Sequence, residues 1–304
     1  MTGRRQHYAH FHGLLPLSSP LERDGRPLVL VHGNCQAESL RVLLAGDGST
    51  PVRTVRVPPV HELTHEDLPR LQRVLDEVDV IVSQPVREGY RDLPLGTADL
   101  LARAPRRPRL VVVPVLRWAA LHPFQVIVRS PAAGEPPLVP YHDLRTLTVA
   151  AGRPELPEVP SARAVRAVRD LSARELRARQ ERHDALPVVD LFEAAGAEAT
   201  HTVNHPGNAV LRGLAGRVLA ALGLPADVPD PGRTLLDSVH APVLPAVLDA
   251  LGLPGPGRAD WLVHGEVTTD ADVRAAHLRW YAEHPGVAQA GLARHAEAAA
   301  ELAA

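Results

Sequence analysis

The chain contains a single cysteine, Cys35, and its position in the sequence predicts a nucleophile. A short apolar run, residues 28–31, precedes it and predicts a buried strand that ends before Gly33. From Gln36 onward apolar residues recur at helical spacing, so Cys35 falls in the first turn of a helix. Free N–H groups and the positive end of the helix dipole favour a thiolate there. The alternative is a small buried apolar side chain, which is what most lone cysteines are.

A second candidate is His205, which stands just before Pro206 and a helix expected over residues 208–222. Loops that lead into a helix often carry functional side chains. A neutral imidazole there could take the proton of Cys35, as in acyl-transfer enzymes with a Cys–His pair, and Asn204 could orient the ring. The alternative is a loop histidine at a helix start, one of 16 histidines in the chain.

The sequence HELTH at residues 61–65 has the spacing of the H-E-x-x-H zinc motif. That motif requires both histidines on one face of one helix. Prolines flank the segment on both sides, and Thr64 with Asp67 form a capping pattern that predicts a new helix from about His65. We therefore expect no metal at this segment.

Polar side chains follow one of the expected strands, where ligands collect in open parallel sheets. Ser83 and Gln84 could contact an acyl or pantetheine amide, and Arg87 or Arg91 a phosphate. An ordinary polar loop is the equal alternative.

Two further segments have open interpretations. Asp143, after Tyr141 in the sequence PYHDL, could be a third catalytic residue, but so could Asp190, and the sequence does not choose between them. Trp118 and Phe124 could line an acyl or adenine pocket, although core packing is the alternative.

The elements that must position these residues alternate between strand and helix in the N-terminal half. We expect an α/β fold with a small parallel sheet and covering helices there, and a helix-rich C-terminal half. The expected strands cover residues 28–32, 52–57, 78–83 and 110–113. The expected helices cover residues 36–44, 68–77, 97–103, 161–182 and 208–222. The expected segments are a lead-in at 1–26, a main domain at 27–225, and a helical extension at 226–304 packed on the same domain.

Composition limits the class of protein. With 304 residues and 45% hydrophobic content, the chain can form one large or two modest domains. A net charge of −2 gives no general surface for nucleic acid. All 33 basic residues are arginine, which excludes a Schiff-base or P-loop lysine but leaves phosphate clamps open. One cysteine, no signal peptide and no membrane-length apolar run predict a cytoplasmic protein without a membrane span.

Four segments occur in the order found in one known family. They are GNCQAESLRVLL, DVIVSQPVREGYRDLPL, PYHDL and TVNHPGNAVLRGLA. Over roughly residues 28–225 the chain resembles the WcbI family, which is assigned to acetyl transfer in bacterial polysaccharide biosynthesis and binds coenzyme A.

This resemblance implies an acyl-CoA site and a cysteine–histidine centre. We expect acetyl-CoA as the donor and no metal. Cys35 would attack the thioester, and His205 would be the base. The Gln36 N–H and the side chain of Asn34 or Gln36 would stabilise the oxyanion. In a variant mechanism the acyl group passes directly to the acceptor, with His205 as base. The expected cofactor contacts are Gly33, Arg41, Ser83, Gln84, Arg87, Tyr90, Arg91, Arg117, Tyr141 and Asn204.

The acceptor would be a hydroxyl or amine of a small molecule or glycan, and an acyl carrier protein is a further expected partner. A thioesterase or esterase with the same centre would use water instead, and the sequence does not distinguish the two. The alternative from another class is a non-catalytic module that binds coenzyme A or a carrier protein. An alkylation-resistant Cys35 in a protein that still binds ligand would favour that module.

Overall fold

The computed structural model describes residues 6–15, 25–46 and 48–304, so much of the expected lead-in at 1–26 lies outside the described residues. The chain forms two compact units, each made of three segments. Unit 1 comprises Met1–Val115, Ala178–Leu191 and Asn208–Leu235, and unit 2 comprises Leu116–Arg177, Phe192–Gly207 and Leu236–Ala304. These units do not coincide with the segments 27–225 and 226–304, whose assignment as domains stays a prediction.

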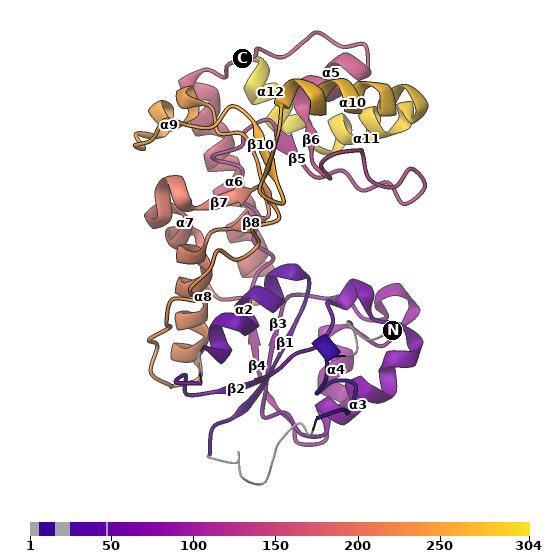
Figure 1. Ribbon diagram of the computed structural model, residues 1–304, viewed down its shortest axis with the longest axis vertical. Helices are drawn as coiled ribbons and strands as arrows, with labels where there is room; N and C mark the ends of the chain where they lie inside the picture. The colour runs from indigo at the N-terminus through magenta and orange to yellow at the C-terminus, as the bar shows by residue number, and fades with distance from the viewer. Residues whose placement is uncertain (1–5, 16–24, 47) are drawn as a thin grey trace. The chain divides into compact units, whose positions relative to one another are not determined.

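Unit 1 contains a four-stranded parallel sheet with helices on both faces (Figure 1). Its strands are β1 (Leu28–His32), β2 (Arg53–Val55), β3 (Val80–Ser83) and β4 (Arg109–Val112). Its helices are α2 (Cys35–Ala45), α3 (Leu68–Leu75), α4 (Thr97–Arg103) and α8 (Asn208–Ala221), with short 3₁₀ turns η2 (Val60–Glu62), η3 (His65–Asp67) and η4 (Tyr90–Asp92). These elements confirm the strands and helices expected for this part of the chain.

The strand order β2-β1-β3-β4 places a topological switch point between β1 and β3. From β1 the chain passes to β2 on one side, and from β2 it returns to β3 on the other. The loops after β1 and β3 therefore lead away from each other, which is where open α/β sheets bind ligands. Cys35 and Gln84 follow these two strands.

Alternating side chains of the sheet explain its two covering layers. Leu28, Leu30 and Ile81 join a buried cluster with residues of α3 and α4, such as Leu71 and Leu100. On the other side of the sheet α2 lies against α8. The apolar stripes predicted from the sequence are thus the faces that bury the sheet.

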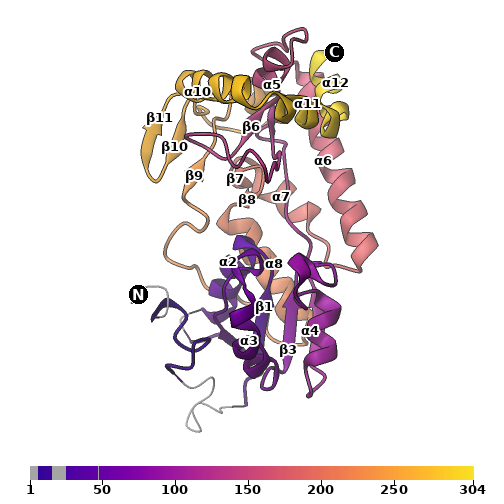
Figure 2. The same cartoon turned by 90° about the vertical axis from the view of Figure 1, so that its right-hand side faces the viewer.

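Unit 2 is built from short strands and from helices. It contains β5 (Gln125–Val126), β6 (His142–Asp143), α5 (Leu144–Ala150), η5 (Gly196–Glu198), β7 (Thr200–Thr202), β8 (His205–Pro206), β9 (Val239–His240), α9 (Pro245–Leu251), β10 (Trp261–Val263), β11 (Glu266–Thr268), α10 (Asp270–Glu283), α11 (Pro285–Arg294) and α12 (Ala296–Ala303). Helices α6 (Ala162–His183) and α7 (Val189–Ala195) carry the chain from one unit into the other. Figure 2 shows α5, α10 and α11 side by side, and their contacts form one core of unit 2.

A three-stranded antiparallel sheet, β11-β10-β9, lies within the segment expected to be a helical extension. Its strands have two or three residues each, too few for an alternating pattern to be recognised. No helix within the described ranges is both long and apolar enough to span a membrane.

The HELTH segment has the local structure expected from its prolines and capping residues. His61 lies in η2 and His65 begins η3, with the Thr64–Asp67 capping box between them and α3. The two histidines therefore do not share one face of one helix, which the zinc motif requires.

A buried histidine makes the fold of unit 1 sensitive to acid. His32 ends β1, is 1% exposed, and hydrogen-bonds the Leu95 carbonyl through Nε2 at 2.8 Å. Burial lowers its pKa to about 4, against the opposing effect of the Leu95 carbonyl. In the unfolded chain His32 takes up a proton as the pH falls below 6.5. In the folded chain it stays neutral until about pH 4.

We expect the free energy of unfolding to fall as the pH is lowered from 7 to 5, by about 2 kcal/mol for His32 at pH 5. The contribution of His32 to the free energy of unfolding is fully present above pH 6.5 and is lost between pH 6.5 and pH 4. Urea denaturation at each pH measures it. H32Q should flatten the slope, whereas replacing the exposed His65 by glutamine should not. An unchanged slope in H32Q would show that His32 does not titrate as described.

Candidate functional site

Cys35 is the first residue of α2 and follows the central strand β1 after a two-residue turn. Its side chain is partly exposed. The N-cap is Asn34, whose side-chain oxygen accepts a hydrogen bond from the Gln36 N–H at 2.9 Å. The sequence folds this way because Asn is a strong N-cap and the apolar residues of α2 bury against the sheet and α8. This is the strand–turn–nucleophile–helix arrangement predicted for Cys35.

Gln84 connects the end of β3 to the cysteine turn. Its Oε1 accepts from the Asn34 N–H at 2.9 Å, and its Nε2 donates to Gln36 Oε1 at 2.9 Å. A Cβ atom at Gly33 would lie 2.3 Å from that Oε1, so a side chain there would displace Gln84 from the turn. Gln84 and Gln36 are both 3% exposed. They thus fix the geometry of the turn, and direct contact with a cofactor does not fit their burial.

Two of the polar roles expected from the sequence do not fit the local hydrogen bonds. Ser83 is fully buried, and its hydroxyl donates to the Gln84 carbonyl and bonds Thr97 Oγ1. It therefore supports the loop after β3 and cannot reach a ligand. The Gln36 N–H, expected to stabilise an oxyanion, is bound by the N-cap oxygen of Asn34.

The arginines expected to bind phosphates differ in the hydrogen bonds and ion pairs that their side chains already make. Arg41 makes a two-point ion pair with Glu38, at 2.7 and 3.0 Å, and also donates to Thr54. Arg91 donates to the His61 carbonyl. Arg87 is exposed in the loop after β3, and the structure records no side-chain partner for it in the described ranges. Arg87 is therefore the arginine of this loop best placed to bind a phosphate. Tyr90, also expected to contact the cofactor, is partly buried and packs against the core.

His205 lies in unit 2, in β8, opposite Thr202 of β7. Burial lowers its pKa to about 4, and nearby His240 adds to this while the Leu236 carbonyl opposes it. The imidazole is therefore neutral near pH 7, the state that a general base needs. Its Nδ1 is buried and has no hydrogen-bond partner among the described residues. Cys35 belongs to the other unit, so their pairing stays a prediction.

Tyr141 and Asn204 lie beside this histidine. The Tyr141 hydroxyl donates to Asn204 Oδ1 at 2.9 Å and accepts from Thr202 Oγ1 at 2.9 Å. The Tyr141 and His205 rings meet edge to face, with an angle of 88° between their planes and 6.1 Å between their centroids. Tyr141 is 4% exposed, so we assign it to supporting His205 rather than to contact with coenzyme A.

Neither predicted third carboxylate is seen to orient His205. Asp143 caps α5 and binds Arg145 at 2.7 Å, in a network with Asp270. Asp190 belongs to unit 1 and forms an ion pair with Arg217. Both carboxylates therefore have structural partners.

The sequence reasoning missed a histidine–aspartate group next to His205. Asp237 Oδ1 lies 2.5 Å from His240 Nε2, and the His240 and His201 ring centroids are 4.2 Å apart. Burial, then the proximity of His240, lowers the pKa of His201 to about 4. Asp237 and His240 are three residues apart in the sequence, whereas His201 reaches them only because β7 lies beside β9.

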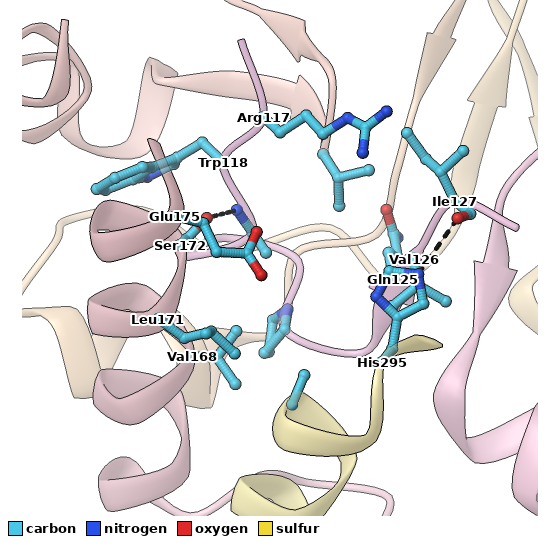
Figure 3. A pocket seen from close by; sticks show the side chains of 14 residues that line it. Arg117, Trp118, Gln125, Val126, Ile127, Val168, Leu171, Ser172, Glu175 and His295 are labelled. Carbon is cyan, nitrogen blue, oxygen red and sulfur yellow. Dashed lines mark hydrogen bonds between the residues drawn. The ribbon is translucent and has the colours of Figure 1, made fainter. Parts of the chain in front are cut away.

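The aromatic residues proposed for a pocket separate into two environments. Trp118 stacks on Phe192 at 5.1 Å and, with Arg117, lines a cavity of unit 2 (Figure 3). Phe124 is a core residue with the Arg145 guanidinium 4.6 Å above its ring. Among the residues that the structure describes, no group of three or more His, Cys, Asp or Glu side chains is arranged to hold a metal ion.

Comparison with known proteins agrees with the fold. The profile of the family described as "Polysaccharide biosynthesis enzyme WcbI" matches residues 28–227. A solved structure described as native WcbI, "a novel polysaccharide biosynthesis enzyme", without a disulfide bond between coenzyme A and one of its cysteines, is similar to this chain. The TM-score is 0.75 at 20% sequence identity, covering 91% of this chain and 98% of that one. A search of curated proteins found no match.

The fold and the site define an α/β protein that presents one cysteine at the switch point of a parallel sheet. The chain belongs to the WcbI family of polysaccharide biosynthesis enzymes.

Proposed function

We propose that this protein is an acyltransferase that moves an acyl group, acetyl in the first instance, from coenzyme A to a hydroxyl or amine. The observation that carries the proposal is Cys35, partly exposed at the N-terminus of α2 and at the sheet's switch point. Family membership and the coenzyme A named for the similar structure support the choice of donor.

The first half of the reaction forms an acyl-enzyme. The Cys35 sulfur attacks the thioester carbonyl, and its proton passes to the neutral His205. As the C–S bond to coenzyme A breaks, His205 returns that proton to the leaving sulfur, so coenzyme A departs as the free thiol and the imidazole is neutral again. In the second half the acceptor attacks the acyl-cysteine, His205 removes the acceptor's proton, and the Cys35 thiol is regenerated. Each half returns one proton through the same imidazole.

For the developing oxyanion we assign the amide nitrogen of Asn34. The Gln36 N–H requires an acceptor, so the N-cap bond identifies the side-chain oxygen of Asn34 and leaves its NH₂ group as a donor. The backbone N–H of Gln36 does not play this part, because it already serves the N-cap.

On this proposal, Arg87 binds a phosphate of coenzyme A. R87A should weaken the binding of coenzyme A by about 1.5–3 kcal/mol, because one charge-assisted hydrogen bond is lost. Isothermal titration calorimetry measures the change. R41A is the matched control, because Arg41 is already neutralised by Glu38 and should change the affinity little. Equal affinities for R87A and the unaltered protein would exclude Arg87 from the site.

The proposal as a whole is tested by the release of free coenzyme A from acetyl-CoA, with and without added sugar and amine acceptors. Release that requires an acceptor supports transfer. Release that is as fast in water alone would identify a thioesterase with the same centre. Binding without any release would identify a non-catalytic module.

A further inference from the structure

Unit 1 contains a cavity that the proposed reaction does not use. It has a volume of about 480 Å³, which is within the range of small-molecule sites. Residues of β2, the edge strand of the sheet, form part of its wall, and Ala45 and Gly48 at the end of α2 form another part (Figure 1). Every described residue that lines it belongs to unit 1, and neither Cys35 nor Gln84 is among them.

Positive charge is in excess in the wall of this cavity. Arg41, Arg53 and Arg56 line it, and among the described residues no aspartate or glutamate does. Glu38 lies 2.7 Å from Arg41 and 2.8 Å from Arg56, so two guanidinium groups share one carboxylate.

Arg53 has no carboxylate partner in the described part of the chain. Its Nε donates to the Arg26 carbonyl at 3.3 Å, and the structure records no contact for its two terminal nitrogens there. The side chain is half-buried, and a charge that is partly removed from water is costly unless an opposite charge joins it. The wall therefore favours an anion.

Neighbouring groups in the wall present hydrogen-bond donors. Arg56 Nη1 donates to His7 Nδ1 at 3.2 Å, so the neutral His7 ring carries its proton on Nε2. Arg41 Nη1 donates to Thr54 Oγ1 at 3.1 Å, which leaves the hydroxyl hydrogen of Thr54 for another acceptor. Because Glu38 contacts both arginines, these residues form one chain of direct contacts from His7 to Thr54.

We infer that this cavity binds a small molecule through a phosphate group. Three guanidinium groups with one carboxylate leave an excess of two positive charges, which matches a phosphate monoester, a group that carries nearly two negative charges at pH 7. Arginine is the side chain best suited to phosphate, because its fork of donors binds two oxygens at once. The inference does not depend on acyl transfer at Cys35, and the site is distinct from the coenzyme A phosphate contact proposed for Arg87.

The test is calorimetric titration of the full chain with glycerol 3-phosphate at constant ionic strength. Succinate carries a similar charge on two carboxylates, and glycerol lacks the phosphate. We expect glycerol 3-phosphate to bind and both analogues to bind at least about tenfold more weakly, since each loses the phosphate contacts. Succinate binding as tightly as glycerol 3-phosphate would overturn the inference, as would the absence of binding by glycerol 3-phosphate.

Variants locate the site. R53Q and R56Q each remove one positive charge and should weaken the binding of glycerol 3-phosphate at least about tenfold. R107Q, at an exposed arginine of unit 1 outside the cavity, should not. Circular dichroism melts confirm that the variants are folded. A folded R53Q or R56Q that binds glycerol 3-phosphate normally would contradict the assignment.

Coenzyme A titrations of the same variants separate this site from the one at Cys35. R53Q should bind coenzyme A like the unaltered protein, because Arg53 begins β2, away from the switch point at the other end of the strands. An equal loss of affinity for coenzyme A and for glycerol 3-phosphate in R53Q would show that the cavity belongs to the coenzyme A site, and would overturn the assignment of a distinct site.

Discussion

Replacing Cys35 by alanine should lower the rate of acyl transfer from acetyl-CoA on the order of a thousand-fold or more. The sulfur is the atom that forms the covalent intermediate, so its removal eliminates the two-step route. Coenzyme A binding should persist, because the phosphate contacts act equally on the ground and transition states. Single-turnover rates and calorimetry on the same variant separate the two effects.

The C35A variant also needs a control for folding. The side chain is partly exposed at the start of α2, and the N-cap and the Gln84 bonds do not involve its sulfur. A thermal melt followed by circular dichroism checks that C35A is folded. Normal turnover by folded C35A would instead support direct transfer, with His205 as base and no acyl-enzyme.

The second large effect is expected at His205. H205A should lower the chemical rate by roughly a hundred- to ten-thousand-fold, with coenzyme A affinity little changed, because a general base acts only while the proton moves. The pKa of about 4 adds a pH signature. His205 stays unprotonated down to about pH 4, so the rate should not fall near pH 6.5 on its account. It should fall only as the pH approaches 4.

The exposed His264 of unit 2 supplies the matched control, and H264A should turn over normally. The neighbouring group of Asp237 and His240 provides the contrasting outcome. If H205A were active and H240A inactive, the base would be His240, oriented by Asp237.

The sequence predicted the parts of unit 1 whose patterns are local. The run at 28–31, the Asn34 cap and the helical spacing after Gln36 are all readable within one stretch of chain, and they place Cys35 correctly. The same holds for the HELTH segment, where prolines and a capping box outweigh a zinc motif.

The remaining features depend on contacts between distant segments. The bonds from Gln84 to the turn span about fifty residues, so the sequence could not show that Gln84 and Gln36 bind each other rather than a ligand. Likewise, Arg41 is a phosphate candidate in sequence but an ion pair in the structure. The His201–His240–Asp237 group needs β7 and β9, strands of three and two residues, to lie side by side, and 16 histidines offer no way to select it beforehand.

The most direct test of acyl transfer through Cys35 is the intact mass of the protein after brief incubation with acetyl-CoA without an acceptor. Because the chain has one cysteine, an acetyl group on sulfur has one site, and hydroxylamine should release it. We predict that the unaltered protein gains the mass of one acetyl group and that C35A gains none. Acetyl-CoA turnover by an unaltered protein whose mass never changes, or acetylation of C35A to the same extent, would contradict the proposed mechanism.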